Sequence, residues 1–288
     1  QVNAAFAKFD TANTGFIPLQ EFGKMADQLG KMPNTPQPTE EQKKGMLDSL
    51  YNELQKYKNK FNKEYLKYAI KLCMPLIFHA FATIILNKCD QLMILKFKTS
   101  TETGIYSYGS NFSHIIYVLY TACNQAYLPW YYKKLNENCI DEINKTTKSY
   151  IKLFSYVFIM FIASLPTIIK IISPETYYQS IYIAPILSLA FYFSFLYTFP
   201  VNYEFFKKKT KYIALGTAFS AIINAMLNYF LIPHFGGIGA SIATAISYFM
   251  LLCAHIFVAK KVIKNYEIDI WFLLKIICFT LIMWSISY

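Results

Sequence analysis

Seven long apolar segments follow one another from residue 68 to the end of the chain, with short polar connections between them. Each is about 18 to 25 residues long, which is enough for a helix to cross a hydrocarbon layer about 30 Å thick. Because lipid offers no hydrogen-bond partners, backbone groups inside it must be satisfied within a helix. The pattern therefore predicts an all-α, polytopic membrane helix bundle of about seven transmembrane helices. The segments cover residues 68–87, 106–131, 150–172, 178–202, 212–234, 237–259 and 269–288.

Lysine is distributed unevenly over the connections. It is frequent before the first segment and after the second, fourth and sixth, whereas the connections after the third and fifth contain none. Lysine-rich connections stay on the cytoplasmic side of a membrane. Lys208 and Lys261 are therefore expected inside, and Pro174 and Gly237 outside. The N-terminus is then cytoplasmic and the C-terminus external, in a multi-pass protein of the inner (plasma) membrane.

The connection 88–103 departs from this rule, because it places Lys88, Lys96 and Lys98 on the expected outside. Seven crossings still fit the remaining connections better than any other number.

Charge and cysteine usage narrow the possible partners. The net charge is +11, and all 28 basic residues are lysine. Because this charge lies mostly in the inner connections, anionic membrane lipid is the expected partner and nucleic acid is not. The six cysteines show no metal-ligand or redox spacing, so they are interpreted as small apolar side chains. No cofactor and no metal site is expected.

Residues 1–45 differ in composition from the rest and resemble half of an EF-hand, followed by a proline-rich linker. Asp10 and Glu21 stand at the first and last ligand positions of the calcium loop. Ala12 and Thr14 stand where further oxygen ligands are needed, and Thr14 offers only a neutral hydroxyl. The segment is therefore interpreted as a degenerate EF-hand, or as a foreign segment, that does not bind calcium.

Residues 46–67 alternate apolar and lysine positions at helical spacing. This is typical of an amphipathic interfacial helix on the inner membrane surface, although a solvated connector helix fits the same pattern. Residues 68–288 then form the transmembrane lobe.

Polar residues recur at helical spacing inside the first, second, fifth and sixth segments. Four such stripes predict a central hydrated cavity, with hydrogen bonding between helices as the simpler alternative. The members of the stripes are His79, Thr83, Asn87 and Asp90; Ser110, His114, Tyr117, Thr121 and Asn124; Thr217, Ser220, Asn224 and Asn228; and Ser241, Thr244, Tyr248 and His255.

Three stretches resemble a known family. They are residues 62–94, residues 103–107 with Pro129 and Trp130, and residues 224–244. Together they are similar to polysaccharide and O-antigen flippases of the multidrug/oligosaccharidyl-lipid/polysaccharide exporter superfamily. The resemblance spans about residues 60–288 and implies the second of two pseudo-symmetric lobes. Gln91 departs from it, because relatives often carry a basic residue there.

The resemblance implies a transporter, not an enzyme, whose cargo is a lipid-linked oligosaccharide moved outward for cell-surface polysaccharide synthesis. The first lobe would come from a missing N-terminal part or from a homodimer. Lys88 is the implied cation for the lipid diphosphate, with His79 and His114 secondary. The candidate cavity residues are His79, Thr83, Asn87, Lys88, Asp90, His114, Asn124, Asn224 and Asn228.

Two other functions stay open at this point. One is a multidrug-type exporter of the same superfamily that uses Asp90 for proton or sodium coupling. The other is a membrane protein without transport activity whose working part is the EF-hand-like module. An enzyme is not expected, because the sequence shows no nucleophile–base constellation and no phosphate-binding loop.

Overall fold

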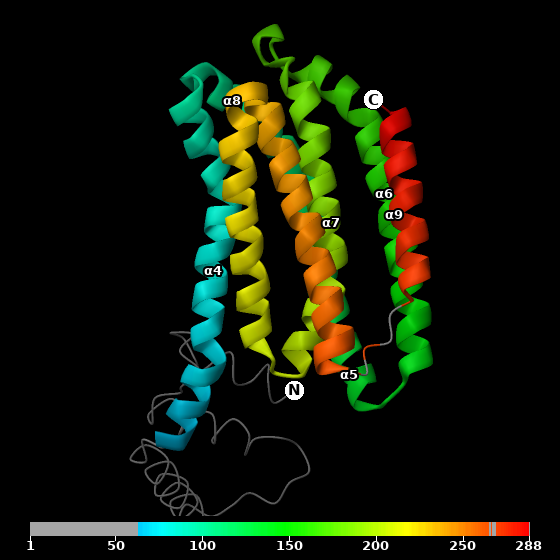
Figure 1. Ribbon diagram of the computed structural model, residues 1–288. Helices are drawn as coiled ribbons and strands as arrows, with labels where there is room; N and C mark the ends of the chain where they lie inside the picture. Colours follow the sequence, from blue (N-terminus) through cyan, green and yellow to red (C-terminus); the bar gives the residue numbers. More distant parts are fainter. Residues whose placement is uncertain (1–62, 265, 267–268, 288) are drawn as a thin grey trace, which may run out of the picture. The chain divides into compact units, whose positions relative to one another are not determined.

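The computed structural model describes residues 63–264, 266 and 269–287. The chain divides into two units, Gln1–Lys67 and Tyr68–Tyr288, and the helix bundle is the second unit. The EF-hand-like segment and residues 46–62 of the interfacial helix lie outside the described residues. Within the described part, every regular element is a helix (Figure 1).

Six α-helices and two short helical turns form the bundle. Four helices are long and apolar enough to cross a membrane, namely those over Leu66–Phe97, Ile140–Ile172, Ser180–Phe206 and Thr210–Ile263. The described part is thus a helical membrane protein, and the number of seven crossings stays a prediction. The elements are α4 (Lys63–Phe97), α5 (Ser100–Asn136), α6 (Ile140–Ile172), η1 (Glu175–Tyr177), α7 (Ser180–Phe206), α8 (Thr210–Phe257), η2 (Val258–Ile263) and α9 (Ile270–Ile286).

The connection predicted over residues 88–103 is wrong. Helix α4 continues to Phe97, and only Lys98 and Thr99 separate it from α5. The lysines in this stretch do not end the helix, because a long lysine stem can carry its charge outward from a helix surface. The Thr99 side chain caps α5 by accepting a hydrogen bond of 3.1 Å from the Glu102 backbone N–H.

Helix α8 folds back on itself at Gly236. The backbone there has φ 55° and ψ −133°, in the region that favours glycine because it has no Cβ. The two arms, residues 210–235 and 237–257, correspond to the fifth and sixth predicted segments, and both are visible in yellow and orange in Figure 1. The turn is braced from α5, since Glu102 Oε1 accepts a 3.1 Å hydrogen bond from the Gly237 N–H.

Side-chain hydrogen bonds show that the two arms of α8 run antiparallel and side by side. Ser220 Oγ donates to the Ser247 carbonyl over 2.7 Å, and Asn224 Nδ2 donates to Thr244 Oγ1 over 3.2 Å. From the first pair to the second, the residue number rises from 220 to 224 in the first arm and falls from 247 to 244 in the second. The arms are therefore a helical hairpin.

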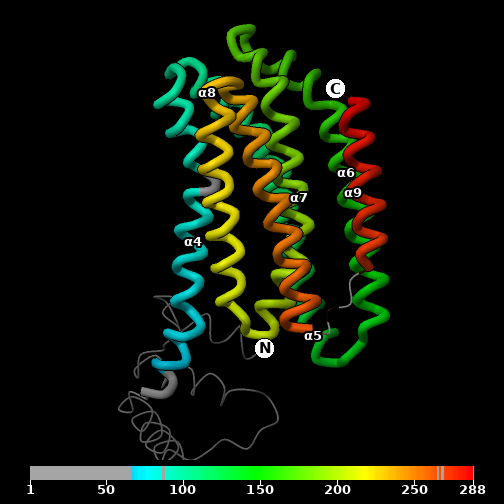
Figure 2. Tube along the Cα trace, in the orientation of Figure 1, coloured from blue at the N-terminus to red at the C-terminus, as the bar shows by residue number. Residues whose placement is uncertain are grey.

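Helix α7 is the central element, packed against α5, α6 and α8, and most of its residues are buried. Aromatic rings fill its contact with α6: Phe195 stacks on Phe154 at 4.0 Å between centroids, and Tyr192 stacks on Phe158 at 4.7 Å. The buried Tyr192 hydroxyl is paired with the hydroxyl of Ser155 at 2.7 Å. Figure 2 shows α6 and α9 side by side at the edge of the unit that lies away from α4.

Helix α4 lies parallel to the first arm of α8. Most of its described apolar side chains are exposed, whereas Ala82 and Ile94 pack into the hydrophobic core. Three hydrogen bonds join α4 to the first arm of α8, each between residues 138 positions apart: Leu72 with Thr210, His79 with Thr217, and Asp90 with Asn228.

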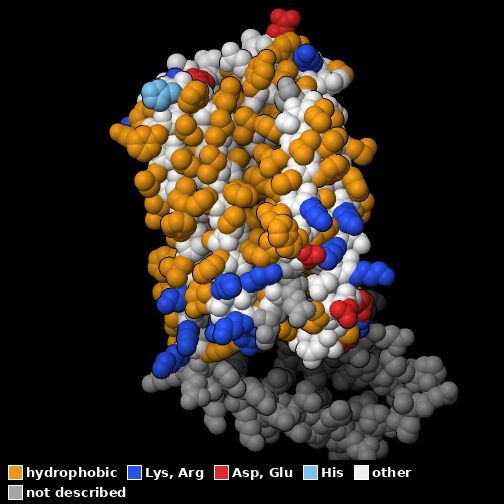
Figure 3. Space-filling view, turned by 45° about the vertical axis from the view of Figure 1, so that its right-hand side comes forward, with side chains coloured by type: hydrophobic (Ala, Val, Ile, Leu, Met, Phe, Trp, Pro, Cys, Tyr) orange, Lys and Arg blue, Asp and Glu red, His pale blue; other side chains and the backbone are white. Residues whose placement is uncertain are grey.

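Lysine side chains gather toward one end of the unit. In Figure 3 the surface is a broad apolar band, with most of the lysines of this face near its lower end. The turns that follow α5 and α7 lie at this end, together with η2 (Figure 1). Which end faces the cytoplasm stays a prediction.

Candidate functional site: a polar cavity and two buried carboxylates

A cavity of about 290 Å³ lies among α4, α5, α7 and α8. Leu251 is the one lining residue without a polar side-chain group. Such a lining inside an apolar bundle requires water or a polar ligand, because polar groups left without partners in a membrane are costly. The lining residues are His79, Thr83, Tyr117, Tyr120, Thr121, Asn124, Gln125, Ser194, Tyr197, Thr198, Thr217, Tyr248 and Leu251.

Hydrogen bonds between helices fix the cavity walls. His79 Nδ1 pairs with Thr217 Oγ1 at 2.8 Å, which joins α4 to α8. On the opposite wall the Tyr120 hydroxyl pairs with Ser194 Oγ at 2.7 Å. Asn124 Oδ1 accepts from Asn202 Nδ2 at 2.8 Å. The walls are thus held in place by side chains that still present polar atoms to the interior.

Three of the nine candidate residues line this cavity: His79, Thr83 and Asn124. The contribution of α7 was missed from the sequence, although Ser194 and Thr198 stand four residues apart within an apolar run. That spacing places both on one helix face and is the signal that could have identified it.

Asp90 lies outside the cavity, contrary to the expectation that it faces it. The side chain is buried, with 2% of the residue exposed. Its carboxylate accepts hydrogen bonds from the Tyr106 hydroxyl at 2.5 Å, Asn228 Nδ2 at 2.6 Å and Thr244 Oγ1 at 2.7 Å. The reason is packing: α5 and the second arm of α8 close over the carboxylate, which the spacing along α4 alone does not reveal.

Asn224 and Asn228 belong to this enclosed cluster, not to the cavity lining. Asn228 Nδ2 also donates to Asn224 Oδ1 at 3.0 Å, and the Asn228 Oδ1 atom is buried without a hydrogen-bond partner. The cluster therefore places several oxygen atoms around Asp90, and one of them, Asn228 Oδ1, accepts no hydrogen bond. Such an arrangement can hold a proton or a small hard cation, which prefers oxygen ligands.

The remaining candidate residues lie elsewhere. His114 Nδ1 bonds within its own helix to the Ser110 carbonyl at 2.9 Å, and its ring packs on Phe191 at 5.1 Å. Lys88 is exposed on α4. The Asn87 side chain lies outside the described set. The implied role of Lys88 and His114 in binding a diphosphate stays a prediction.

A second buried carboxylate was missed from the sequence. Glu204 of α7 and His255 of α8 are both fully buried, with Glu204 Oε1 and His255 Nδ1 2.9 Å apart. Glu204 stands two residues after the fourth apolar segment, and His255 closes the stripe of the sixth. Each of the two residues stands near the end of an apolar helix, and the two helices end on the same side of the bundle. This shared position is the signal that could have predicted the pair from the sequence.

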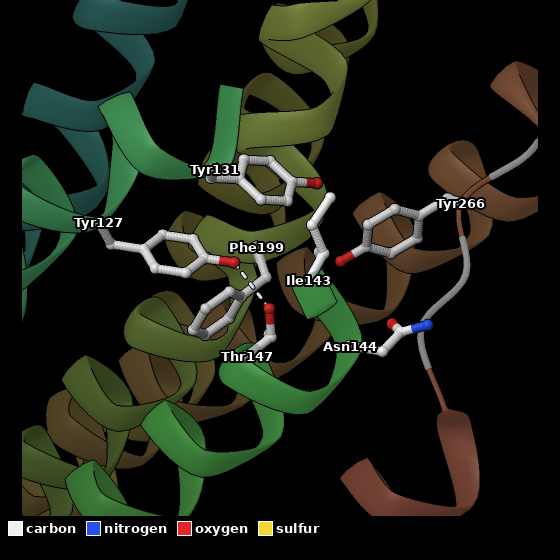
Figure 4. A pocket seen from close by; sticks show the side chains of 7 residues that line it. All are labelled: Tyr127, Tyr131, Ile143, Asn144, Thr147, Phe199 and Tyr266. Carbon is white, nitrogen blue, oxygen red and sulfur yellow. Dashed lines mark hydrogen bonds between the residues drawn. The ribbon is translucent and has the colours of Figure 1, made fainter. Parts of the chain in front are cut away.

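A smaller hollow lies between α5, α6 and Tyr266 (Figure 4). Its volume is about 20 Å³, close to the space that one water molecule needs. The Tyr127 hydroxyl and Thr147 Oγ1 close one side with a 2.7 Å hydrogen bond. We assign it no ligand.

Two curated proteins match the chain. A Haemophilus influenzae protein named for the Lsg locus is 26% identical over 215 residues, which is 68% of this chain and 51% of that protein. A second Haemophilus influenzae protein, named an uncharacterized membrane protein, is 23% identical over 190 residues, which is 63% of this chain and 43% of that protein. The chain thus spans about half the length of the curated relatives it matches. No protein-family model and no solved structure matches it.

Proposed function

We propose that this chain is the C-terminal half of a membrane transporter that flips a lipid-linked oligosaccharide across the cytoplasmic membrane for cell-surface polysaccharide synthesis. The observation that carries the proposal is the polar cavity of about 290 Å³ inside a bundle with an apolar exterior. Polar side chains within membrane helices commonly mark a pathway for polar cargo. The resemblance of three stretches to flippases supports the choice of cargo.

The size of the cavity supports the proposal that this chain is one half of a larger transporter. Sites for small molecules measure about 300 to 1,000 Å³, so this cavity stands at the lower limit and cannot enclose an oligosaccharide. In many transporters the cargo site lies between two halves that rock against each other. The cavity would then be one wall, and the opposite wall would come from an N-terminal lobe or from a second copy. The length of the relatives is consistent with the first source.

The test is a bulky substitution in the cavity of the full-length, two-lobe protein. Thr121→Trp fills space between α5 and its neighbours, because the threonine hydroxyl bonds only to carbonyls of its own helix. The matched control is Thr167→Trp, which places the same side chain at an exposed position on α6. We expect Thr121→Trp to abolish complementation of a flippase-deficient strain at equal protein level, and Thr167→Trp to retain it. Equal transport by both variants would contradict the proposal.

A cation-coupled multidrug exporter is the second candidate, and the enclosed Asp90 cluster favours it. A lone carboxylate held by three neutral donors can exchange a proton or a sodium ion during transport. Cargo separates the two functions, since an exporter should confer drug resistance in a strain that lacks lipid-linked sugars. Loss of resistance in Asp90→Asn, without any effect on glycan export, would favour the exporter.

A further inference from the structure

The Glu204–His255 pair has a feature that a purely structural ion pair does not need. Both side chains are fully buried, yet only one atom of each takes part in the 2.9 Å contact. Glu204 Oε2 and His255 Nε2 are buried without hydrogen-bond partners. A buried polar atom left unpaired costs free energy, so two of them on adjoining titratable groups require a use.

The surroundings supply no second charge that would fix the charge state of the pair. Within the described part of the chain, His255 is the only basic side chain within 4 Å of the Glu204 carboxylate, although η2 beside it carries Lys260 and Lys261. Other titratable groups in the neighbourhood of the pair include His79 of α4, Tyr197 of α7 and Tyr266 after η2.

The pair lies next to the cavity, toward the lysine-rich end of the unit. The Tyr197 ring lies 5.7 Å from the His255 ring and lines the cavity. Leu251, another lining residue, precedes His255 by four residues, a rise of about 6 Å along the helix. Glu204 stands two residues before the end of α7. The pair therefore lies close to the cavity and close to the turn that follows α7.

The glycine at position 216 leaves the space that the His255 imidazole occupies. A Cβ atom at Gly216 would come within 2.8 Å of His255 Nε2, so glycine at this position leaves room for the free edge of the imidazole. Gly216 directly precedes Thr217, which bonds the cavity residue His79. The unpaired nitrogen thus faces the helix segment that forms the cavity wall.

We propose that Glu204 and His255 form a proton-binding site beside the cavity, distinct from the Asp90 cluster. With Nδ1–H donating to Glu204, a neutral imidazole leaves a lone pair on Nε2 and the pair carries one negative charge. A proton taken from water at Nε2 or Oε2 forms one N–H or O–H bond and makes the pair neutral. Burial of an unbalanced charge is costly, so the pair holds this proton whenever the site is closed.

The consequence for transport rests on the proposed function. Opening of the cavity to water lowers the cost of the charged state, so the pair releases its proton when water reaches it and binds one again on closure. Proton binding itself does not depend on the cargo or on the second lobe. The test can therefore read the site directly, and its failure is distinguishable from failure of the transport proposal.

The experiment is a histidine titration of the chain in detergent micelles. The chain has only four histidines, so nitrogen-15 signals of labelled imidazoles can be assigned by single substitutions. We expect the His255 signal to change with pH, and Glu204→Gln to shift the midpoint of this change by about one pH unit or more, a tenfold change in proton affinity. The reason is that a neutral amide no longer stabilises the imidazolium. The matched control, Glu175→Gln in the exposed turn η1, should leave the midpoint unchanged.

A pair that is only structural gives a different result: the His255 signal does not change with pH while the chain stays folded, in the parent chain and in Glu204→Gln. That outcome would overturn the proposal. Should Glu204→Gln fail to fold, Gly216→Ala replaces it, because the added Cβ displaces the imidazole edge. An unchanged His255 titration in Gly216→Ala would then contradict the site. In proteoliposomes of the two-lobe protein, Glu204→Gln should also change the pH profile of transport while the Glu175→Gln profile remains parental.

Discussion

Asp90 shares hydrogen bonds with side chains from α5 and from both arms of α8, so its carboxylate joins three helical segments. The Asp90–Asn228 hydrogen bond is one of three that link α4 to the first arm of α8, which makes it important for the position of α4. The charge is tolerated in an apolar bundle because three donors replace the water that burial removes. One side chain thereby combines a structural role with a potential for ion binding.

We predict that Asp90→Ala destabilises the unit by roughly 3 kcal/mol or more, because it leaves buried donors of Tyr106, Asn228 and Thr244 without an acceptor. Asp90→Asn keeps an acceptor oxygen and should cost less. It should still abolish transport by the two-lobe protein, since the charge is lost. The measurements are thermal unfolding in detergent and transport at equal protein level. Lys96→Gln on the exposed side of α4 is the control, and parental transport by Asp90→Asn would show that Asp90 serves packing alone.

Asp269 gives a pH dependence with a definite sign. Its carboxylate accepts a hydrogen bond from the Lys148 ammonium over 2.8 Å. It also caps α9 by accepting a hydrogen bond from the Phe272 N–H over 3.0 Å. The Lys148 ammonium, with the backbone hydrogen bond, lowers the pKa of Asp269 below its usual 3.8. The stabilisation is therefore complete above pH 3.8 and is lost as the pH falls through the lower pKa of the folded state.

We predict that Asp269→Asn lowers the unfolding temperature at pH 6 and that its difference from the parent chain shrinks at pH 3. Added salt should also reduce the difference at pH 6, because both partners are partly exposed and the attraction is screened. The measurement is thermal unfolding at the two pH values. Asp141→Asn, an acid in the first turn of α6, is the control. A difference that grows on acidification would contradict the assigned pKa.

The hairpin of α8 depends on one residue. Gly236 has positive φ, and a Cβ there would overlap Glu102 Oε1, the atom that caps the second arm. We predict that Gly236→Ala costs about 1–2 kcal/mol from the left-handed backbone alone, with a further loss from the displaced cap. Gly104→Ala is the control, because nothing lies within 4 Å of its Cβ and alanine favours a helix. Unfolding temperatures in detergent measure both, and equal stability of the two variants would rule out the strained turn.

At the scale of elements, the sequence predicts a helix well where the length of an apolar segment sets the extent of that helix. All seven apolar segments correspond to helical stretches, counting the two arms of α8. The error at residues 88–103 has a physical cause. The first uninterrupted apolar segment ends before Lys88, whereas Leu92, Ile94 and Leu95 continue the apolar helix past it, and lysine can remain exposed on a helix.

Side-chain placement was harder to predict, because it depends on contacts between helices. Periodicity placed Asp90 on the same face of α4 as His79 and Thr83. It could not reveal that Tyr106 and Thr244 would close over the carboxylate while leaving the other two residues at the cavity. The Glu204–His255 pair was missed for the same reason, since the partners lie on different helices and 51 positions apart.

At the scale of the whole molecule, lysine distribution and helix direction together define a topology. The turns after α5 and α7 lie at the lysine-rich end, whereas η1 and the Gly236 turn lie at the opposite end (Figure 1). Since positive connections are retained inside, Lys208 should face the cytoplasm and Pro174 the exterior. Gly237, which was expected outside, is buried within its turn, so the neighbouring exposed His234 is the better position for a label.

We predict that Thr176→Cys and His234→Cys react with a membrane-impermeant maleimide in intact cells, and that Lys208→Cys reacts only after permeabilisation. All three positions are exposed, so differences in labelling report the side of the membrane and not burial. The experiment needs a cysteine-free parent, because all six native cysteines are free and none is fully buried. That parent, without an added cysteine, is the control for background labelling. Reaction of Lys208→Cys in intact cells, with His234→Cys silent, would invert the orientation and place the Glu204–His255 pair near the external end of the cavity.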